Sequence, residues 1–207
     1  MIRPTRGKAY VSNLIPCITV IVHRPEESVI ETLAQALKLI TKTLGPFMTD
    51  NDVKTLLKAF FQNISSSQAA FRRAAANMIL TTCLNCRKPQ IFLCYVLNYL
   101  LDAIIPVSDD IDHLNTVIGT FGCLKVILPY IATPTECEAS DKQQLDNFLQ
   151  IYELCLHYTK WHSNHNLINS ALETLAQLLQ YPSNAFKSVL LSKEGISHSK
   201  IEVNQEA

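Results

Sequence analysis

The stretch DNDVKTLLKAFFQNISSSQAAFRRAAANMILTTCLN, residues 50–85, decides the fold of this 207-residue chain. Its first half carries apolar residues at i, i+3, i+4, i+7, i+8 and i+11, from Val53 to Ile64. Its second half repeats nearly the same spacing from Phe71 to Cys83. A helix of 3.6 residues per turn gathers such positions into one apolar stripe. The stretch therefore predicts two antiparallel amphipathic helices joined by a three-serine turn.

Polar residues mark where these two helices should begin. Asp50 is placed to cap the first helix, and Ser66 or Ser67 to cap the second. A side-chain oxygen at such a position can accept a hydrogen bond from an unpaired backbone N–H. An isolated pair of this kind would leave apolar surface in water, so we expect it to stack on neighbouring elements.

The composition excludes several functional classes. Lys+Arg and Asp+Glu both number 18, and a net charge of zero argues against a nucleic-acid binder held by a general electrostatic field. The five glycines form neither GxGxxG nor GxxxxGK, so no phosphate-binding loop or cofactor is expected. Without a nucleophile elbow or an oxyanion site, the chain is not predicted to be an enzyme. The seven cysteines, scattered among apolar residues, indicate reduced intracellular thiols.

No membrane-spanning segment is predicted. Residues 1–22 loosely imitate a secretory signal, but Asn13 and Pro16 interrupt the apolar run and no cleavage site follows. Residues 89–101 are uncharged but too short to cross a bilayer.

Similar apolar stripes predict helices along the rest of the chain. A helix at 8–22 should be kinked by Pro16, a second at 26–44 ends at Gly45-Pro46, and the polar stretch TECEASDKQQ at 135–144 is predicted to be a gap. Taken in pairs, the stripes define a domain of residues 1–194, with repeats at 8–45, 50–87, 88–132 and 141–181, a short helix at 183–192, and a polar, disordered tail at 195–207.

The spacing between pairs is that of HEAT or armadillo repeats, which have periods of roughly 40 to 47 residues. The sequence ETLAQ also occurs twice, at 31–35 and 173–177, each time on a second helix of a pair. The predicted fold is therefore all-α, an α-solenoid (a HEAT/armadillo-type superhelix) of about four antiparallel helix pairs. A closed helical bundle is the rival arrangement, and it would need no period.

Several blocks of the chain resemble the amino-terminal HEAT-repeat domain of the huntingtin family over about residues 8–182. They are YVSNLIPCIT (10–19), RPEESVIETLA (24–34), NDVKTLLKAFFQNISSS (51–67), FRRAAA (71–76), LNYLLDAIIPV (97–107), FLQIYELCLHYT (148–159) and NHNLINSALETLAQLLQ (164–180). The family's amphipathic leader, glutamine tract and proline-rich segment are absent from the sequence. We therefore expect a fragment of a divergent family member, of the kind an invertebrate could carry.

The resemblance implies a non-enzymatic protein-interaction scaffold. Huntingtin-like proteins are cytoplasmic and partly nuclear helical solenoids that link vesicles to microtubule motors, in axonal transport and in autophagy. The implied partners are a huntingtin-associated protein, motor and vesicle adaptors, and the rest of the parent solenoid. No nucleic-acid partner is expected.

Contacts with partners are predicted on the second helix of each pair, at 26–44, 67–85, 110–131 and 165–180. Stacked repeats offer extended curved surfaces, and we expect these helices to line the concave side. The candidate contact residues are Glu31, Gln35, Arg72, Arg73, Asn169 and Glu173. The basic pair Arg72-Arg73 is expected to be solvated or to pair with Glu31 or another acid. Because the terminal repeats lack polar capping helices, the isolated chain is expected to self-associate.

Three alternatives remain open from the residues. The first is a small helical domain that binds a metal through Cys155, His157, His162 and His165. Within this alternative, a weaker metal candidate is the motif formed by Cys83 and Cys86, with Cys94 nearby. Structural zinc needs a further pair of ligands, so buried thiols are the favoured interpretation. Asp109, Asp110 and Asp112 lack the calcium-loop pattern and are interpreted as capping residues.

The second alternative is a nucleic-acid-binding HEAT module that would use Arg72, Arg73, Arg87 and Lys88. The third is a generic HEAT adaptor unrelated to transport.

Overall fold

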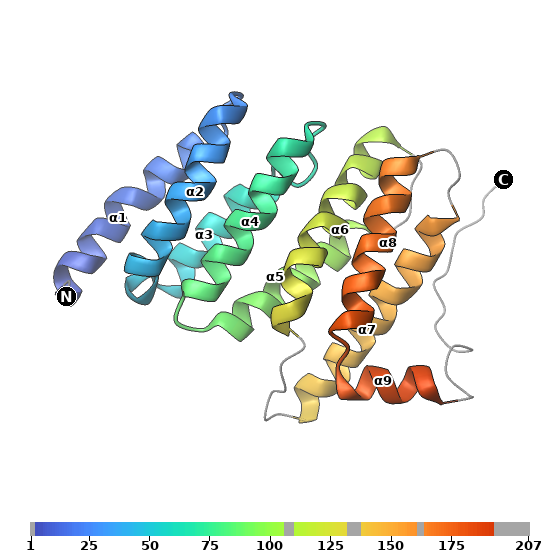
Figure 1. Ribbon diagram of the computed structural model, residues 1–207. Helices are drawn as coiled ribbons and strands as arrows, with labels where there is room; N and C mark the ends of the chain where they lie inside the picture. Colours follow the sequence, from blue (N-terminus) through green and yellow to red (C-terminus); the bar gives the residue numbers. More distant parts are fainter. Residues whose placement is uncertain (1–2, 106–109, 132–137, 161–163, 193–207) are drawn as a thin grey trace.

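The computed structural model describes residues 3–105, 110–131, 138–160 and 164–192, and the regular structure in these ranges is helical throughout. The helices are α1 (Pro4–Ile21), α2 (Glu27–Leu44), the short 3-10 helix η1 (Gly45–Phe47), α3 (Asp50–Phe61), α4 (Ala69–Asn85), α5 (Pro89–Ala103), α6 (Ile111–Ile131), α7 (Glu138–Thr159), α8 (His165–Gln180) and α9 (Asn184–Leu191). Consecutive helices from α1 to α8 form antiparallel pairs in a row (Figure 1). The all-α solenoid is confirmed.

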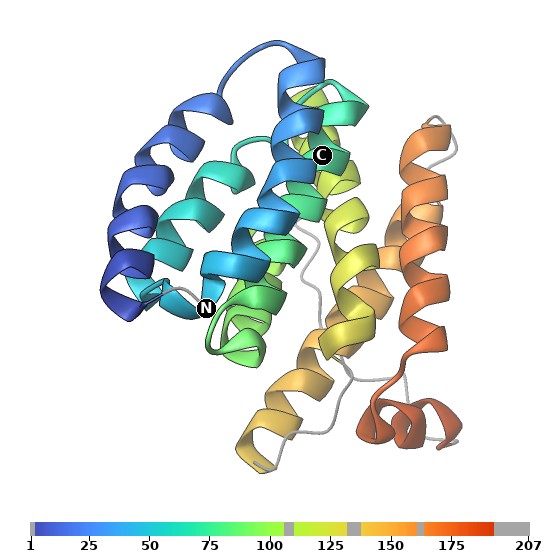
Figure 2. The ribbon, with the colours of Figure 1, turned by 60° about the vertical axis from the view of Figure 1, so that its left-hand side comes forward.

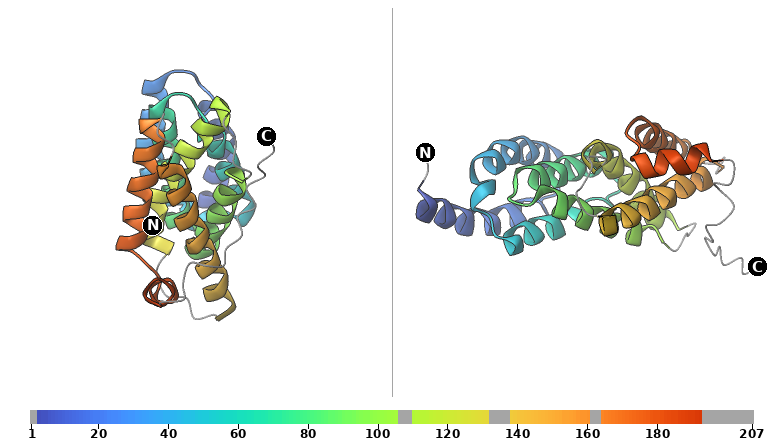
Figure 3. Two further views of the ribbon diagram at one scale, coloured as in Figure 1. Left: turned by 90° about the vertical axis from the view of Figure 1, so that its right-hand side faces the viewer. Right: turned by 90° about the horizontal axis from the view of Figure 1, so that it is seen from below.

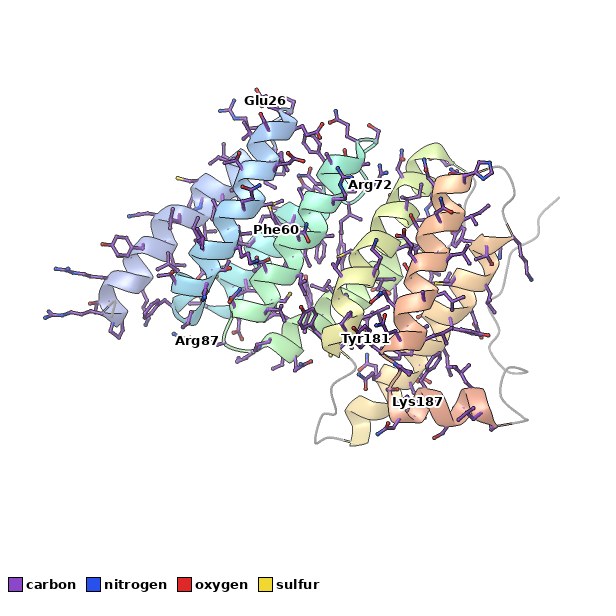
Figure 4. All side chains as sticks on the ribbon, viewed as in Figure 1. Glu26, Phe60, Arg72, Arg87, Tyr181 and Lys187 are labelled. Atoms are coloured by element: carbon purple, nitrogen blue, oxygen red, sulfur yellow. The ribbon has the colours of Figure 1, made fainter. Side chains whose placement is uncertain are left out.

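The row has two layers, which lie one above the other along the elongated molecule (Figure 3). The first-helix layer consists of α1, α3, α5 and α7. The second-helix layer consists of α2, α4, α6 and α8, which lie side by side (Figure 2). The apolar core fills the space between the layers, and Phe60 of α3 is fully buried there (Figure 4). Burial of such stripes is the main source of stability in stacked repeats.

The two layers are packed to different extents. Neighbouring second helices contact each other extensively along the whole row, whereas neighbouring first helices share fewer contacts. Between α3 and α5, for example, the rings of Phe61 and Tyr99 stack with centroids 3.7 Å apart. The second helices therefore form the more closely packed layer of the stack. Their place on the concave side stays a prediction.

Glycine allows close backbone approach on either side of α4. A Cβ atom on Gly45 would fall far inside van der Waals contact with the carbonyl oxygen of Asn85, at the end of α4. A Cβ atom on Gly119 of α6 would collide with the carbonyl oxygen of Ile64, in the turn before α4. Both positions therefore require glycine if neighbouring repeats are to pack this closely.

Two buried threonines, Thr41 and Thr174, take part in polar links between repeats. Each second helix buries one threonine, namely Thr41, Thr82, Thr120 and Thr174. The Thr174 hydroxyl donates to the carbonyl oxygen of Phe121 on α6 at 3.0 Å. Asn85 Nδ2 of α4 donates to Thr41 Oγ1 of α2 at 3.3 Å.

The predicted caps of α3 and α4 were wrong. Thr49, not Asp50, caps α3, and it forms a capping box in which Asp52 accepts from the Thr49 backbone N–H. The N-cap of α4 is Gln68, without a side-chain cap bond, while Ser66 Oγ accepts from the Gln68 backbone N–H at 3.2 Å. A serine that bonds within its own turn is unavailable as a helix cap.

Two helix starts also differ from prediction. The first helix begins at Pro4 rather than residue 8, because proline is well tolerated at a first helical position. Helix α7 begins at Glu138, inside the stretch predicted as a gap. Its polar first turns carry no apolar stripe, but Glu, Ala, Lys and Gln all favour helix. The predicted tail at 195–207 lies outside the described residues.

The ETLAQ repeat is not a structural repeat. Leu33 is buried and Thr32 is exposed in the first copy, whereas Thr174 is the fully buried residue of the second copy. The two copies therefore present different faces of their helices to the core, and their identity does not mark equivalent positions.

Within the described ranges, one stretch, His113–Ile131 of α6, is long and apolar enough to cross a membrane by length and composition. Half of it is buried in the structure. Helix α6 packs against α4, α5 and α8, and contact on three sides accounts for its apolar composition.

Candidate protein-interaction surface

A groove of about 350 Å³ opens in the second-helix layer across α4, α6 and α8. We call it the second-helix groove. It is lined by Ala69, Arg72, Arg73, Ala76, Asn77, Ile118, Gly119, Gly122, Lys125, Val126, Ser170 and Glu173. A pocket of this size is within the range that proteins use to hold ligands or partner side chains.

Small residues make the groove possible. Ala69 and Ala76 line it from α4, and Gly122 lines it from α6. A Cβ atom added to Gly122 would meet nothing within 4 Å, in contrast to Gly119 three residues earlier. Gly119 thus brings α6 close to the α3–α4 turn, while Gly122 leaves open space beside it.

Arg72 joins the groove to the turn before α4 (Figure 4). Its Nη1 atom donates to the carbonyl oxygens of Ser66 at 2.6 Å and Ser67 at 2.9 Å. Burial lowers the pKa of Arg72 below its ordinary value, and the neighbouring positive charge of Arg73 lowers this pKa further. Of the two alternatives expected for the basic pair, the ion pair with Glu31 is absent among the described residues: Arg72 is held by backbone carbonyls and Arg73 is exposed to solvent.

Arg73 and Asn77 lie one helical turn apart on α4 and are exposed. Arg73 forms no ion pair within the described parts of the chain. Its guanidinium therefore offers five N–H donors at the groove.

The opposite side of the groove contains an ion pair. Lys125 Nζ of α6 lies 2.7 Å from Glu173 Oε2 of α8, and both side chains are substantially exposed. The lining then contains three basic side chains and one acidic side chain, a local net charge of +2 in a chain whose formal net charge is zero.

The predicted contact residues divide into two groups. Arg72, Arg73 and Glu173 meet in the groove. The others, Glu31 and Gln35 on α2 and Asn169 on α8, are exposed on the second helices but outside the groove lining.

Sequence reasoning missed Lys125, Asn77 and Gly122 as groove residues. Lys125 had a signal, since it is the only charged residue between residues 114 and 131. Gly122 had a weaker signal, because glycines three residues apart on a helix suggest close approach, but only the structure shows which glycine touches a neighbour.

The residues proposed for a metal are not gathered in the described parts of the chain. Cys155 is buried in the core, and burial raises the pKa of its thiol to about 12, so the metal-binding thiolate is disfavoured. His165 is exposed, and His162 lies outside the described residues. No group of three or more potential ligands occurs within the described ranges.

Cys83 and Cys86 form a buried thiol pair at the end of α4. Burial raises the pKa of both thiols, and Cys86 Sγ contacts the carbonyl oxygen of Cys83 at 3.1 Å. Cys94 of α5 is exposed.

Arg87 and Lys88 bond to other residues of the fold. Arg87 Nε donates to the carbonyl oxygen of Pro46 at 2.6 Å, and Lys88 Nζ pairs with Asp50 Oδ2 at 2.7 Å. They lie beyond the opposite end of α4 from Arg72 and Arg73, roughly 20 Å away at a helical rise of about 1.5 Å per residue. The four basic residues considered for nucleic acid therefore do not form one patch.

Comparison with known proteins supports the resemblance. Residues 1–88 match the family profile described as Huntingtin, N-terminal HEAT 1. The chain is 35% identical to Huntingtin of Takifugu rubripes over 213 residues, covering 97% of the chain and 7% of that protein. It is 26% identical to the HD protein homolog of Dictyostelium discoideum over 86% of the chain and 6% of that protein. The chain thus spans a small part of the length of each relative.

Proposed function

The chain belongs to the huntingtin family, and from this premise we propose that it serves as a non-enzymatic scaffold segment that binds partner proteins on its second-helix layer. The observation that carries the proposal is the second-helix groove, a largely apolar recess that bears charged side chains and lies in the more closely packed layer of the solenoid. Three residues that the sequence marked as candidate contacts line it. Solenoids bind partners on such extended concave surfaces.

We further propose a place for this scaffold in microtubule-based vesicle transport, including axonal transport, and in autophagy. The partners would be a huntingtin-associated protein and motor or vesicle adaptors, with the rest of the parent solenoid continuing the stack. The setting would be the cytoplasm and also the nucleus. Support for these assignments comes from family membership, and the chain covers 7% of the Takifugu relative.

Site-specific photo-crosslinking in the full-length parent protein, inside its own cells, tests the binding face. The photoreactive residue replaces Glu31, Asn77 or Asn169, which are exposed on three second helices. Lys58, exposed on α3 of the first-helix layer, is the matched control position. We expect adaptor proteins to be captured from the second-helix positions. Capture of the same proteins from Lys58 alone would overturn the proposed face.

A bulky substitution that blocks the groove distinguishes a role in transport from a generic adaptor role. Asn77→Trp places a large ring at the groove, while Lys58→Trp is the control on the other layer. We expect Asn77→Trp to reduce both adaptor co-purification and vesicle movement along microtubules. Loss of a partner with unchanged vesicle movement would favour a HEAT adaptor unrelated to transport.

A further inference from the structure

We propose that the second-helix groove recognises an acidic, extended segment of a partner protein, with the Arg72–Arg73 pair of α4 receiving its carboxylates. The inference rests on the proposed scaffold function and adds the chemistry of the partner. It follows from the geometry of one groove, and it assigns different roles to the three basic side chains that line it.

Arg73 supplies the positive charge that is available to a partner. It is exposed at the groove, and no described residue forms an ion pair with it. A planar guanidinium with free donors can bind a carboxylate through two parallel N–H···O bonds. An aspartate or glutamate side chain is the simplest protein group that fits this donor arrangement.

Arg72 is pre-positioned beside it. Two carbonyl oxygens, of Ser66 and Ser67, hold its Nη1 atom, so its orientation is fixed before any partner arrives. The donors on Nε and Nη2 form no hydrogen bond with described residues. A donor that is already immobilised loses little further entropy on binding, which favours recognition.

The two guanidinium groups also repel each other. Burial, followed by the charge of Arg73, lowers the pKa of Arg72, although an arginine stays protonated at neutral pH. A carboxylate placed near both groups would relieve this repulsion.

Lys125 has a different role, because Glu173 already neutralises it at 2.7 Å. The ion pair forms the far wall of the groove, and Glu173 would repel a carboxylate that approached this wall. An acidic segment is therefore directed to the α4 side. Gly122 and the two alanines keep the groove open enough for a peptide backbone to approach.

An acidic peptide fits the surroundings better than nucleic acid does. The chain carries no net charge, and Arg87 and Lys88 are occupied at the other end of α4. A nucleic-acid strand needs a series of phosphate contacts, whereas one or two carboxylates match two arginines.

Fluorescence anisotropy with three labelled probes tests the proposal on the whole chain. The probes are a peptide of alternating glutamate and serine, the same peptide with glutamine in place of glutamate, and oligo-dT of matched length. We expect the glutamate peptide to bind, the glutamine peptide to bind at least about tenfold more weakly, and oligo-dT to bind no better than the glutamine peptide.

Variants at one position then assign the binding to Arg73. Arg73→Glu should lower the affinity for the glutamate peptide by at least about tenfold, and Arg73→Lys by less, because the charge remains while the bidentate geometry is lost. Lys58→Glu makes the same change in net charge on the first-helix layer and should leave the affinity within about twofold. Circular dichroism and urea unfolding verify that each variant is folded.

Three outcomes would overturn the proposal. They are no binding of the glutamate peptide, equal losses with Arg73→Glu and Lys58→Glu, and oligo-dT binding that is tight and lost in Arg73→Glu. The last result would make the groove a phosphate site. If the acidic peptide fails while crosslinks from Glu31 and Asn169 persist in the Arg73→Glu parent protein, the scaffold function stands and only the partner chemistry is wrong.

Discussion

The two ends of α4 carry the same kind of residue pair and use it differently. At its end, Arg87 and Lys88 contact Pro46 and Asp50, so both cations hold neighbouring repeats together. At its beginning, Arg72 is held by carbonyl oxygens of the preceding turn and lines the groove, and Arg73 faces the groove without an ion pair to any described residue. A pair of basic residues in a solenoid can therefore stabilise the fold or bind a partner. The contacts that each basic side chain makes show which role it has.

The largest expected effects concern the glycines pressed against either end of α4. Gly45→Ala and Gly119→Ala should each lower the free energy of unfolding by about 2–3 kcal/mol, because the new Cβ atom meets a backbone carbonyl that cannot move aside. Urea unfolding of each variant measures the loss.

Gly122→Ala is the control on the same helix as Gly119. Its Cβ atom meets nothing within 4 Å, and alanine favours helix, so stability should rise by up to about 1 kcal/mol. Equal stabilities of the alanine variants at 119 and 122 would mean that α6 does not pack on the turn before α4 as described.

Substitution of two asparagines of α4, one at its end and one at the groove, should change stability by different, intermediate amounts. Asn85→Ala removes a half-buried amide that bonds to Thr41 Oγ1 and to the carbonyl oxygen of Thr81, and should cost about 1–2 kcal/mol. Asn77→Ala changes an exposed groove residue and should stay within about 0.5 kcal/mol of the parent. Thermal unfolding of both variants provides the comparison, and a larger loss for Asn77→Ala would contradict it.

A smaller effect is expected at Lys88. The Lys88–Asp50 pair is about half exposed, so Lys88→Ala should cost less than about 1 kcal/mol. The cost should shrink at high salt because mobile ions screen exposed charges. A double-mutant cycle with Asp50→Ala, measured at two salt concentrations, isolates the pair. A coupling that does not change with salt would show that the pair is more buried than the structure indicates.

The helical solenoid could be predicted from the sequence because apolar periodicity directly reports the face that a helix buries. The stripe from Val53 to Ile64 and the stripe from Phe71 to Cys83 both lie on core-facing sides. Periodicity fails where a helix has no apolar face, so the polar beginning of α7 at Glu138 was missed. Helix caps were also missed, because threonine, aspartate and asparagine stand side by side from Thr49 to Asp52, and only backbone geometry selects one of them.

The site was less predictable, since it depends on which repeats meet. Arg72, Arg73 and Glu173 were recognised as outward residues of second helices, yet Arg73 and Glu173 are separated by 100 positions in the chain. Their shared groove depends on the packing of α6 between α4 and α8. Likewise, the sequence does not distinguish Arg73 from Arg87, because the contact of Arg87 with Pro46 spans two repeats.

The most direct test of the contrast between the two ends of α4 is to measure unfolding and acidic-peptide binding side by side for Arg73→Ala and Arg87→Ala. Arg73→Ala should leave the free energy of unfolding within about 0.5 kcal/mol of the parent and should abolish most of the binding to the glutamate–serine peptide. Arg87→Ala should lower stability by about 0.5–1.5 kcal/mol and should retain the binding. If Arg87→Ala weakens peptide binding as much as Arg73→Ala does, or if Arg73→Ala is the more destabilising change, the assignment of one end of α4 to partners and the other to the fold is contradicted.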